Sequence, residues 1–190
     1  METNFFEEED FKNKDYTSAP LTRGDYEVCS FFNCNFSRSA LSEIRFIECD
    51  FKDCDLSNVH LAKTSFQDCS FDNCKMIGLN FSDCESFGLS IKVKDSVLDH
   101  SVFYKVKMPN LKILNSKLHN TDFSLGTYTN SDFRNSDLLN AVFQDSNLEG
   151  SDFRNSKNFS INPEHNNIKR CKFSLSEING LLHKYDLVIE

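Results

Sequence analysis

The eight cysteines are the residues of this 190-residue chain with the most obvious capacity for chemistry. Thiolates bind zinc or form disulfides, and zinc sites favour close pairs of the C-x2-C type. The seven cysteines from Cys29 to Cys84 are instead separated by 5, 10 or 15 residues, and Cys171 stands far from them. This spacing predicts free, buried, structural thiols rather than a metal centre or a disulfide framework.

Other catalytic signals are absent from the sequence. It contains no glycine-rich phosphate loop, no G-x-S-x-G elbow and no H-E-x-x-H motif. The five histidines lie far apart in the sequence, at positions 60, 100, 119, 165 and 183. We therefore expect a protein that is not an enzyme and that binds no cofactor.

The sequence repeats with a period of five residues, and this repeat determines where the cysteines and the other side chains lie. A large apolar residue stands at every fifth position from Phe6 to Ile91 except at Ser86, and the pattern resumes from Leu98 to Phe153 after a slip of two residues. A small residue, often cysteine or serine, lies two positions before most of the large ones. Neither a helix nor a flat strand has this period. It predicts that two residues in five point inward and three face water.

Units such as CDFKD, CSFDN, TDFSL and SDFRN resemble the motif of the pentapeptide-repeat family, from about residue 6 to residue 156. The resemblance implies an all-β solenoid, a right-handed quadrilateral β-helix in which four units make one coil and residues twenty apart stack. Two aromatic ladders follow, one through Phe11, Phe31, Phe51 and Phe71 and one through Phe103, Phe123 and Phe143. Stacked cysteines would have nearly parallel Cβ vectors, which disfavours disulfides.

The domain organisation expected from this pattern has three parts. Residues 1–5 are a flexible N-terminus, and residues 6–173 form the β-helix, with the register slip within 82–97 and an irregular last coil at 157–173. The slip is either a tolerated insertion at a corner or a loop that contacts a partner. Residues 174–190 form a short helix and a tail. Ser174 or Ser176 is expected to begin this helix, which carries an apolar side made by Ile178, Leu181, Leu182 and Tyr185.

The charge of the chain limits its partners. It carries 29 acidic and 21 basic residues, a net charge of −8. We therefore expect no binding to free nucleic acid, because polyanions require a basic face. The charge is uneven: residues 1–91 hold 17 acids and 8 bases, whereas residues 92–117 hold six lysines against Asp95 and Asp99. With neither a signal peptide nor a long apolar run, we also expect no membrane contact and a cytoplasmic location.

The C-terminal segment resembles a narrower group. FSINPEHNNIK, followed by a leucine pair and a β-branched tail, is similar to the ends of the quinolone-resistance (Qnr-type) and microcin-immunity pentapeptide-repeat proteins. That resemblance implies an end-to-end homodimer that mimics duplex DNA in the DNA-binding saddle of type II topoisomerases. Carried over by position, the dimer contacts would be Leu181, Leu182, Leu187, Val188 and Ile189.

We therefore predict a DNA mimic that binds gyrase or topoisomerase IV and protects it from quinolones or a peptide toxin. The acids expected to face the enzyme are Asp122, Asp132, Asp137 and Asp152 near the dimer centre, with Asp50 and Asp55 further out. The weakly acidic C-terminal part and the lysine-rich band fit this function poorly. The alternative is a rigid scaffold that docks an unrelated protein on a flat face or on a band containing Lys105, Lys107 and Lys112.

Overall fold

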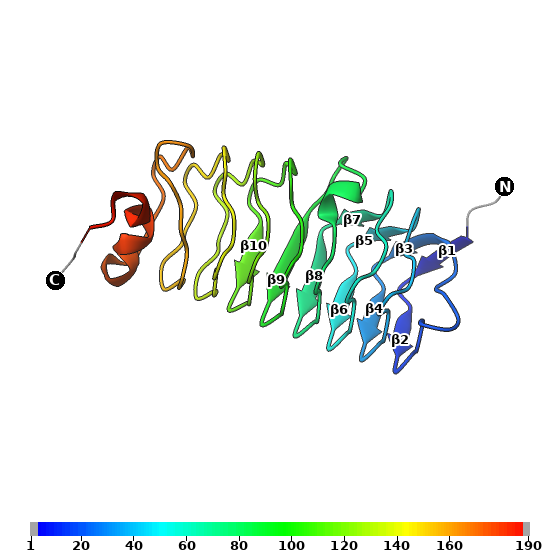
Figure 1. Ribbon diagram of the computed structural model, residues 1–190. Coiled ribbons are helices and arrows are strands. Elements are labelled where there is room, and N and C mark those ends of the chain that lie inside the picture. Colours follow the sequence, from blue (N-terminus) through cyan, green and yellow to red (C-terminus); the bar gives the residue numbers. More distant parts are fainter. Residues whose placement is uncertain (1–3, 188–190) are drawn as a thin grey trace.

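The computed structural model describes residues 4–187, which form a rod of stacked coils (Figure 1). Two sides of the rod carry parallel sheets, with the strand orders β1-β3-β5-β7 and β10-β9-β8-β6-β4-β2. Residues twenty apart are paired between neighbouring coils, as in Phe11 with Phe31. Isolated parallel bridges continue the stack beyond β10. The strands are β1 (Asn4–Glu7), β2 (Asp10–Lys12), β3 (Gly24–Glu27), β4 (Ser30–Phe32), β5 (Arg45–Ile47), β6 (Asp50–Lys52), β7 (Ser65–Gln67), β8 (Cys69–Asp72), β9 (Ile91–Lys94) and β10 (Lys112–Leu114).

The corners of the coil depend on residues that tolerate a left-handed backbone. In nearly every unit the residue two positions after the large one has a positive φ, and asparagine is the commonest residue there. Asparagine adopts this conformation more readily than most residues. Asn115, Asn135 and Asn155 occupy one such column, with φ values of 51°, 59° and 61°. Their side-chain amides bond from coil to coil, at 3.0 Å for Asn135 to Asn115 and 3.2 Å for Asn155 to Asn135.

The interior of the rod is aromatic, as the spacing predicts. Successive rings of the ladder from Phe11 to Phe71 stack with centroids 4.8 Å apart. The second ladder continues from Phe103 to Phe143 at 4.9 Å. Rings of neighbouring columns meet edge to face, and both arrangements are favourable for aromatic side chains. These ladders supply a large share of the buried apolar surface that holds the coils together.

The small inward residues are hydrogen-bond donors as well as spacers. The Cys49 thiol donates to the carbonyl of Tyr26 at 3.3 Å, and the Ser151 hydroxyl donates to the carbonyl of Tyr128 at 2.7 Å. Each bond joins one coil to the preceding one. All eight cysteines are free; six of them are buried, as predicted, whereas Cys84 and Cys171 are only half-buried. Burial raises the pKa of Cys49 to about 12, so its thiol stays protonated and able to donate.

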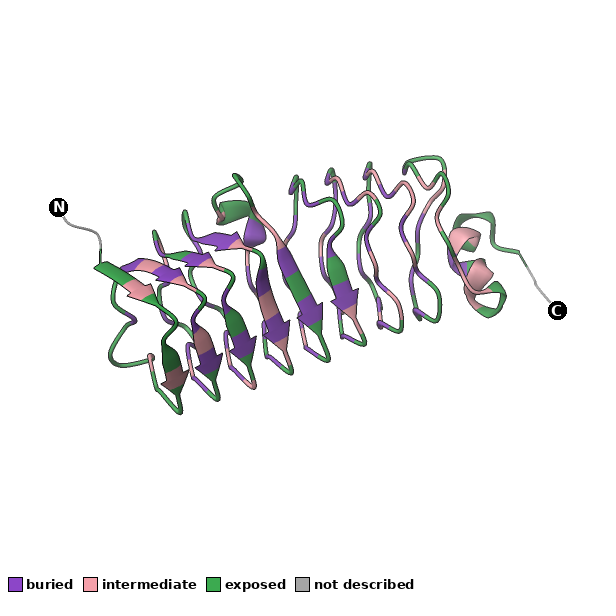
Figure 2. Ribbon diagram, turned by 180° about the vertical axis from the view of Figure 1, so that it is seen from behind, coloured by how far each residue is buried: buried purple, intermediate pink, exposed green. Residues whose placement is uncertain are grey.

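The register slip is a bulge on one corner of the rod. Glu85 still bonds to the carbonyl of Thr64, but Cys69 pairs with Ile91, twenty-two residues later. The two extra residues therefore lie between Glu85 and Ser90, within the predicted range. The bulge follows the short 3-10 helix η1 (Phe81–Asp83) and protrudes from the rod as an exposed loop (Figure 2). Phe87 stands on it with 81% of its surface exposed.

The two ends of the rod differ. At the N-terminal end β1 begins at Asn4, two residues before the predicted start of the solenoid, because Asn4 pairs with Gly24. At the C-terminal end the predicted helix consists of two 3-10 helices, η2 (Leu175–Leu181) and η3 (His183–Tyr185). Ser174 begins η2, but its hydroxyl bonds to Asn155 instead of capping the helix. Gly180 lies against Phe159, where a Cβ would clash, and η2 thereby covers the last coil.

Candidate functional site

The six acids expected to face a target lie on three sides of the rod. Asp50, Asp132 and Asp152 belong to one column of paired residues, on the side formed by the sheet from β10 to β2. Asp55 and Asp137 belong to the column of the next side, and Asp122 lies between Val102 and Val142 on a third. The six carboxylates therefore do not form one acidic face.

Two of these acids are neutralised by their own unit. The Arg134 guanidinium donates to both oxygens of Asp132, with Nη2 2.7 Å from Oδ2, and Arg154 binds Asp152 in the same way at 2.6 Å. The hydrogen bond from Arg154 lowers the pKa of Asp152, whose side chain is only 13% exposed. Carboxylates paired in this manner contribute little negative potential to a distant partner.

Asp137 and Asp122 are also engaged within the chain. Partial burial disfavours the charged form of Asp137, but the hydrogen bond from Asn158 at 2.7 Å and the nearby His119 side chain outweigh it and lower the pKa. His119 Nε2 lies 3.0 Å from the Asp137 carboxylate. Asp122 accepts the backbone N–H of Ser124 at 2.8 Å and forms no ion pair in the described part of the chain.

A group of carboxylates that form no ion pair in the described part of the chain lies at the other end of the rod. Glu8, Glu48 and Asp68 occupy one corner column between the two sheets, which Val28 interrupts between Glu8 and Glu48, and Asp50 follows Glu48 at the start of β6. All four are exposed, and none forms an ion pair within residues 4–187. We call these four residues the N-terminal acidic corner. Of these four acids only Asp50 was predicted, because the prediction considered acids that directly precede a large apolar residue. The other three can be recognised in the sequence by their spacing, which is a multiple of twenty residues.

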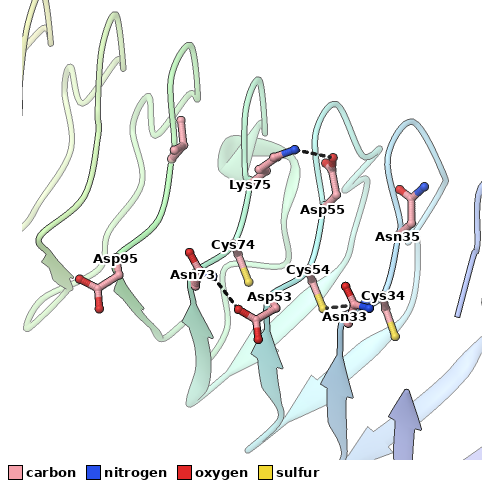
Figure 3. Close-up of a pocket in the computed structure, with 11 residues that line it drawn as sticks. Asn33, Cys34, Asn35, Asp53, Cys54, Asp55, Asn73, Cys74, Lys75 and Asp95 are labelled. Atoms are coloured by element: carbon pink, nitrogen blue, oxygen red, sulfur yellow. Dashed lines mark hydrogen bonds and ion pairs between the residues drawn. The ribbon is translucent and has the colours of Figure 1, made fainter. Parts of the chain in front are cut away.

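An open trough of about 510 Å³ lies beyond the C-terminal ends of β4, β6, β8 and β9 (Figure 3). Its polar groups are bonded to one another along the rod: Asn73 donates to Asp53 at 2.6 Å, and the Lys75 ammonium lies 3.8 Å from Asp55. Asp55, one of the predicted contacts, is therefore partly neutralised. Across residues 4–187 no three His, Cys, Asp or Glu side chains are placed to hold a metal ion. No helix in this range has the length and apolar character of a membrane span.

A parallel solenoid of five-residue units, with flat sides and charged corners, defines a class of β-helical repeat protein whose exposed surface is suited to protein contacts. Residues 24–95 match the family model described as the pentapeptide repeat region, and residues 127–157 match the one described as pentapeptide repeats (8 copies). The chain belongs to the pentapeptide-repeat family.

Solved structures share this fold. Full-length QnrB1, described as a plasmid-mediated fluoroquinolone resistance protein, is 17% identical and superposes with a TM-score of 0.63 over 97% of this chain and 100% of its own. A trypsin-treated QnrB1 variant gives 0.65 at 18% identity, over 95% and 98% of the two chains. HetL from the cyanobacterium Nostoc sp. strain PCC 7120, described as involved in heterocyst differentiation regulation, gives 0.52 at 14% identity, over 88% and 84%. No curated protein matches the sequence. At these identities the likeness concerns the fold.

Proposed function

We propose that this protein is a non-enzymatic DNA mimic that binds a type II topoisomerase, gyrase or topoisomerase IV, and protects it from quinolones or a peptide toxin. The observation that carries the proposal is the N-terminal acidic corner, a group of carboxylates on a rigid rod that form no ion pair within residues 4–187. The likeness in fold to QnrB1 along the full length of both chains supports the same assignment.

The physical basis is charge repetition. Neighbouring coils are about 4.8 Å apart, judging from the stacked rings of Phe31 and Phe51. Duplex DNA carries one negative charge per about 3.4 Å of each strand. Glu48 and Asp68 stand on adjacent coils, and Glu8 lies two coils before Glu48 because Val28 occupies the same column between them. These carboxylates thus offer a sparser row of charge to a basic DNA-binding groove. Such an attraction speeds association and weakens as salt is added.

The proposal includes a homodimer formed through the C-terminal segment. Leu187 is 58% exposed, and Leu175 on η2 is 88% exposed, which leaves apolar surface at this end of the rod. Leu181 and Leu182 are half-buried, and Leu181 packs against the core. Val188 and Ile189, the other predicted contacts, lie outside the described residues. A two-fold axis here would place the two acidic corners at the far ends of a long rod.

The test is DNA supercoiling by purified gyrase in the presence of a fluoroquinolone. We expect the protein to restore supercoiling and reduce cleaved DNA at low concentration, and to inhibit the enzyme at higher concentration. The rescue should weaken as salt is raised. If neither gyrase nor topoisomerase IV responds across the full concentration range, the proposal is wrong.

The second candidate is a scaffold that uses the lysine-rich band. Lys92 and Lys112 are exposed neighbours on the sheet side, and neither forms an ion pair in the described range. Reversal of the charges of Lys105, Lys107 and Lys112 separates the two functions. Loss of the cellular phenotype in that variant, with acid substitutions silent, would favour the scaffold.

A further inference from the structure

The bulge at the register slip borders a notch that the proposed function does not use. The notch has a volume of about 500 Å³ and lies between the bulge and the following coil. Its lining includes the core residue Phe81, the half-buried Leu89, and Tyr104 and Val106 from the next coil. Phe87 lies on the bulge between Ser86 and Leu89, two residues that line the notch, and its side chain is exposed. An exposed phenylalanine next to an apolar notch is typical of an association surface.

Charges of opposite sign flank the notch along the rod axis. Asp83 and Glu85 lie on its N-terminal side, and Lys105 and Lys107 lie on its C-terminal side. All four are exposed, and the structure pairs none of them with an opposite charge in residues 4–187. The Lys105 ammonium lies 5.0 Å from the centroid of the Tyr104 ring, directly on the rim.

The bulge is held in shape by two hydrogen bonds and a glycine turn. The Glu85 carboxylate accepts the N–H of Phe87 at 3.3 Å, and the N–H of Ser90 bonds to the carbonyl of Phe66 at 2.9 Å. Gly88 has a φ of +72°, which a side chain would strain. Phe87 is therefore presented from a defined turn, with little entropy to lose on docking.

We propose that this surface binds a second copy of the same chain, laid antiparallel along the side of the rod. A two-fold axis perpendicular to the rod exchanges its N-terminal and C-terminal sides. Phe87 of each copy then enters the notch of the other, and Lys105 and Lys107 face Asp83 and Glu85 of the second copy. An isologous contact requires a self-complementary patch. A surface on which negative, apolar and positive groups follow one another along the rod is self-complementary when a second copy lies antiparallel to it.

The two parts of the surface have different roles. The buried phenylalanine supplies most of the affinity, and the charged rim sets the antiparallel orientation and the rate of association. A parallel arrangement would oppose like charges. This side contact is separate from the C-terminal dimer of the proposed function, so each can exist without the other.

The experiment is sedimentation velocity over a wide range of concentrations, with every chain also carrying Leu187→Asp to remove the proposed end-to-end contact. The chain without further changes should form a dimer. Phe87→Ala should weaken dimerisation by at least about tenfold. Phe32→Ala, which removes an exposed aromatic ring on the sheet side, is the control and should leave it unchanged.

Charge reversal gives the sharper test. K105E/K107E has an entirely acidic rim and D83K/E85K an entirely basic one, so each should be monomeric alone. An equimolar mixture of the two should form heterodimers. K92E/K112E, which reverses two lysines on the sheet side, should dimerise like the parent. The proposal fails if the parent is a monomer throughout, if the reversed variants self-associate as well as the parent, or if the mixture forms no heterodimer.

Discussion

Phe81 and Phe103 are separated by twenty-two residues, yet their rings stack with centroids 4.4 Å apart. Phe103 and Phe123, separated by the usual twenty, stack at 4.9 Å. The core is therefore continuous across the register slip, because the two extra residues leave the rod entirely. The solenoid tolerates an insertion at a corner without loss of its aromatic ladder.

This continuity predicts that the bulge is dispensable for folding. Deletion of Phe87 and Gly88 restores the twenty-residue coil and removes no core side chain. We expect the free energy of unfolding in urea to change by no more than about 1 kcal/mol, since short changes in a surface loop have small entropic effects. Deletion of Leu138 and Leu139 within a regular coil is the matched control and should abolish the cooperative transition. Equal damage from the two deletions would contradict the prediction.

The aromatic ladder predicts a large difference between neighbouring phenylalanines. Phe51 is fully buried between Phe31 and Phe71, whereas Phe32 is 40% exposed. Phe51→Ala leaves a cavity and should lower the free energy of unfolding by about 3–5 kcal/mol. Phe32→Ala should change it by no more than about 0.5 kcal/mol. Urea denaturation of both variants checks this, and a small effect of Phe51→Ala would show that the rings can repack.

The sequence predicts the core better than the surface. Residue type and the period of five identify Phe51 and Cys49 as inward, because a narrow interior admits only one arrangement of large and small groups. The same period leaves the position of the bulge open within 82–97, since only the backbone bonds of Glu85 and Ser90 show where the chain leaves the coil and where it returns.

The acids were harder to place because each side of the rod is only one unit wide. Asp132 and Asp137 belong to different sides although they are five residues apart, and the slip shifts every later column by two. Arg134 neutralises Asp132 and follows it by two residues in the sequence. This pairing could have been predicted from the local sequence, but the spacing of the repeats alone does not indicate it.

The corner asparagines predict a specific order of stabilities. Asn135 has a φ of 59° and bonds to Asn115 and Asn155. Asn135→Ala loses these bonds and puts in the left-handed conformation a residue that tolerates it less well than asparagine does, at a cost of about 1–2 kcal/mol. Asn135→Gly loses the bonds but relieves the backbone strain, so it should be the more stable of the two variants. Thermal and urea unfolding of the three proteins gives the order, and alanine above glycine would contradict it.

Asp152 predicts part of the acid sensitivity of the fold. Its hydrogen bond to Arg154 holds the pKa in the folded chain below 3.8, the ordinary value. The stabilisation is therefore complete above about pH 5 and is lost as the pH falls from there through the lowered pKa. Asp152→Asn should be less stable than the parent at pH 7, and the difference in the free energy of unfolding should shrink as the pH falls below 3.8. For Arg154→Leu, too, the difference from the parent in the free energy of unfolding, measured by urea denaturation, should become smaller at low pH. A difference that does not change with pH would show that the Asp152–Arg154 pair does not contribute to the acid sensitivity.

The last prediction concerns which acids act on the target. The N-terminal acidic corner is unpaired, whereas Asp132 and Asp152 are held by arginines within their own units. Glu48→Gln, Asp50→Asn and Asp68→Asn together remove three charges that face solvent. If attraction to a basic groove drives binding, this triple variant should need at least about tenfold more protein to protect gyrase, and its protection should depend less on salt.

The matched control is the pair Asp132→Asn and Asp152→Asn. This control variant leaves two guanidinium groups without their carboxylates and lowers the net negative charge by two. The change falls at a place on the surface where the ion pairs of the parent are already nearly neutral. Protection should therefore fall less per charge removed than in the triple variant. Circular dichroism of both variants separates binding from folding. If the control loses protection and the triple variant keeps it, the contact lies in the C-terminal half, and the N-terminal acidic corner is only a solvated edge of the rod.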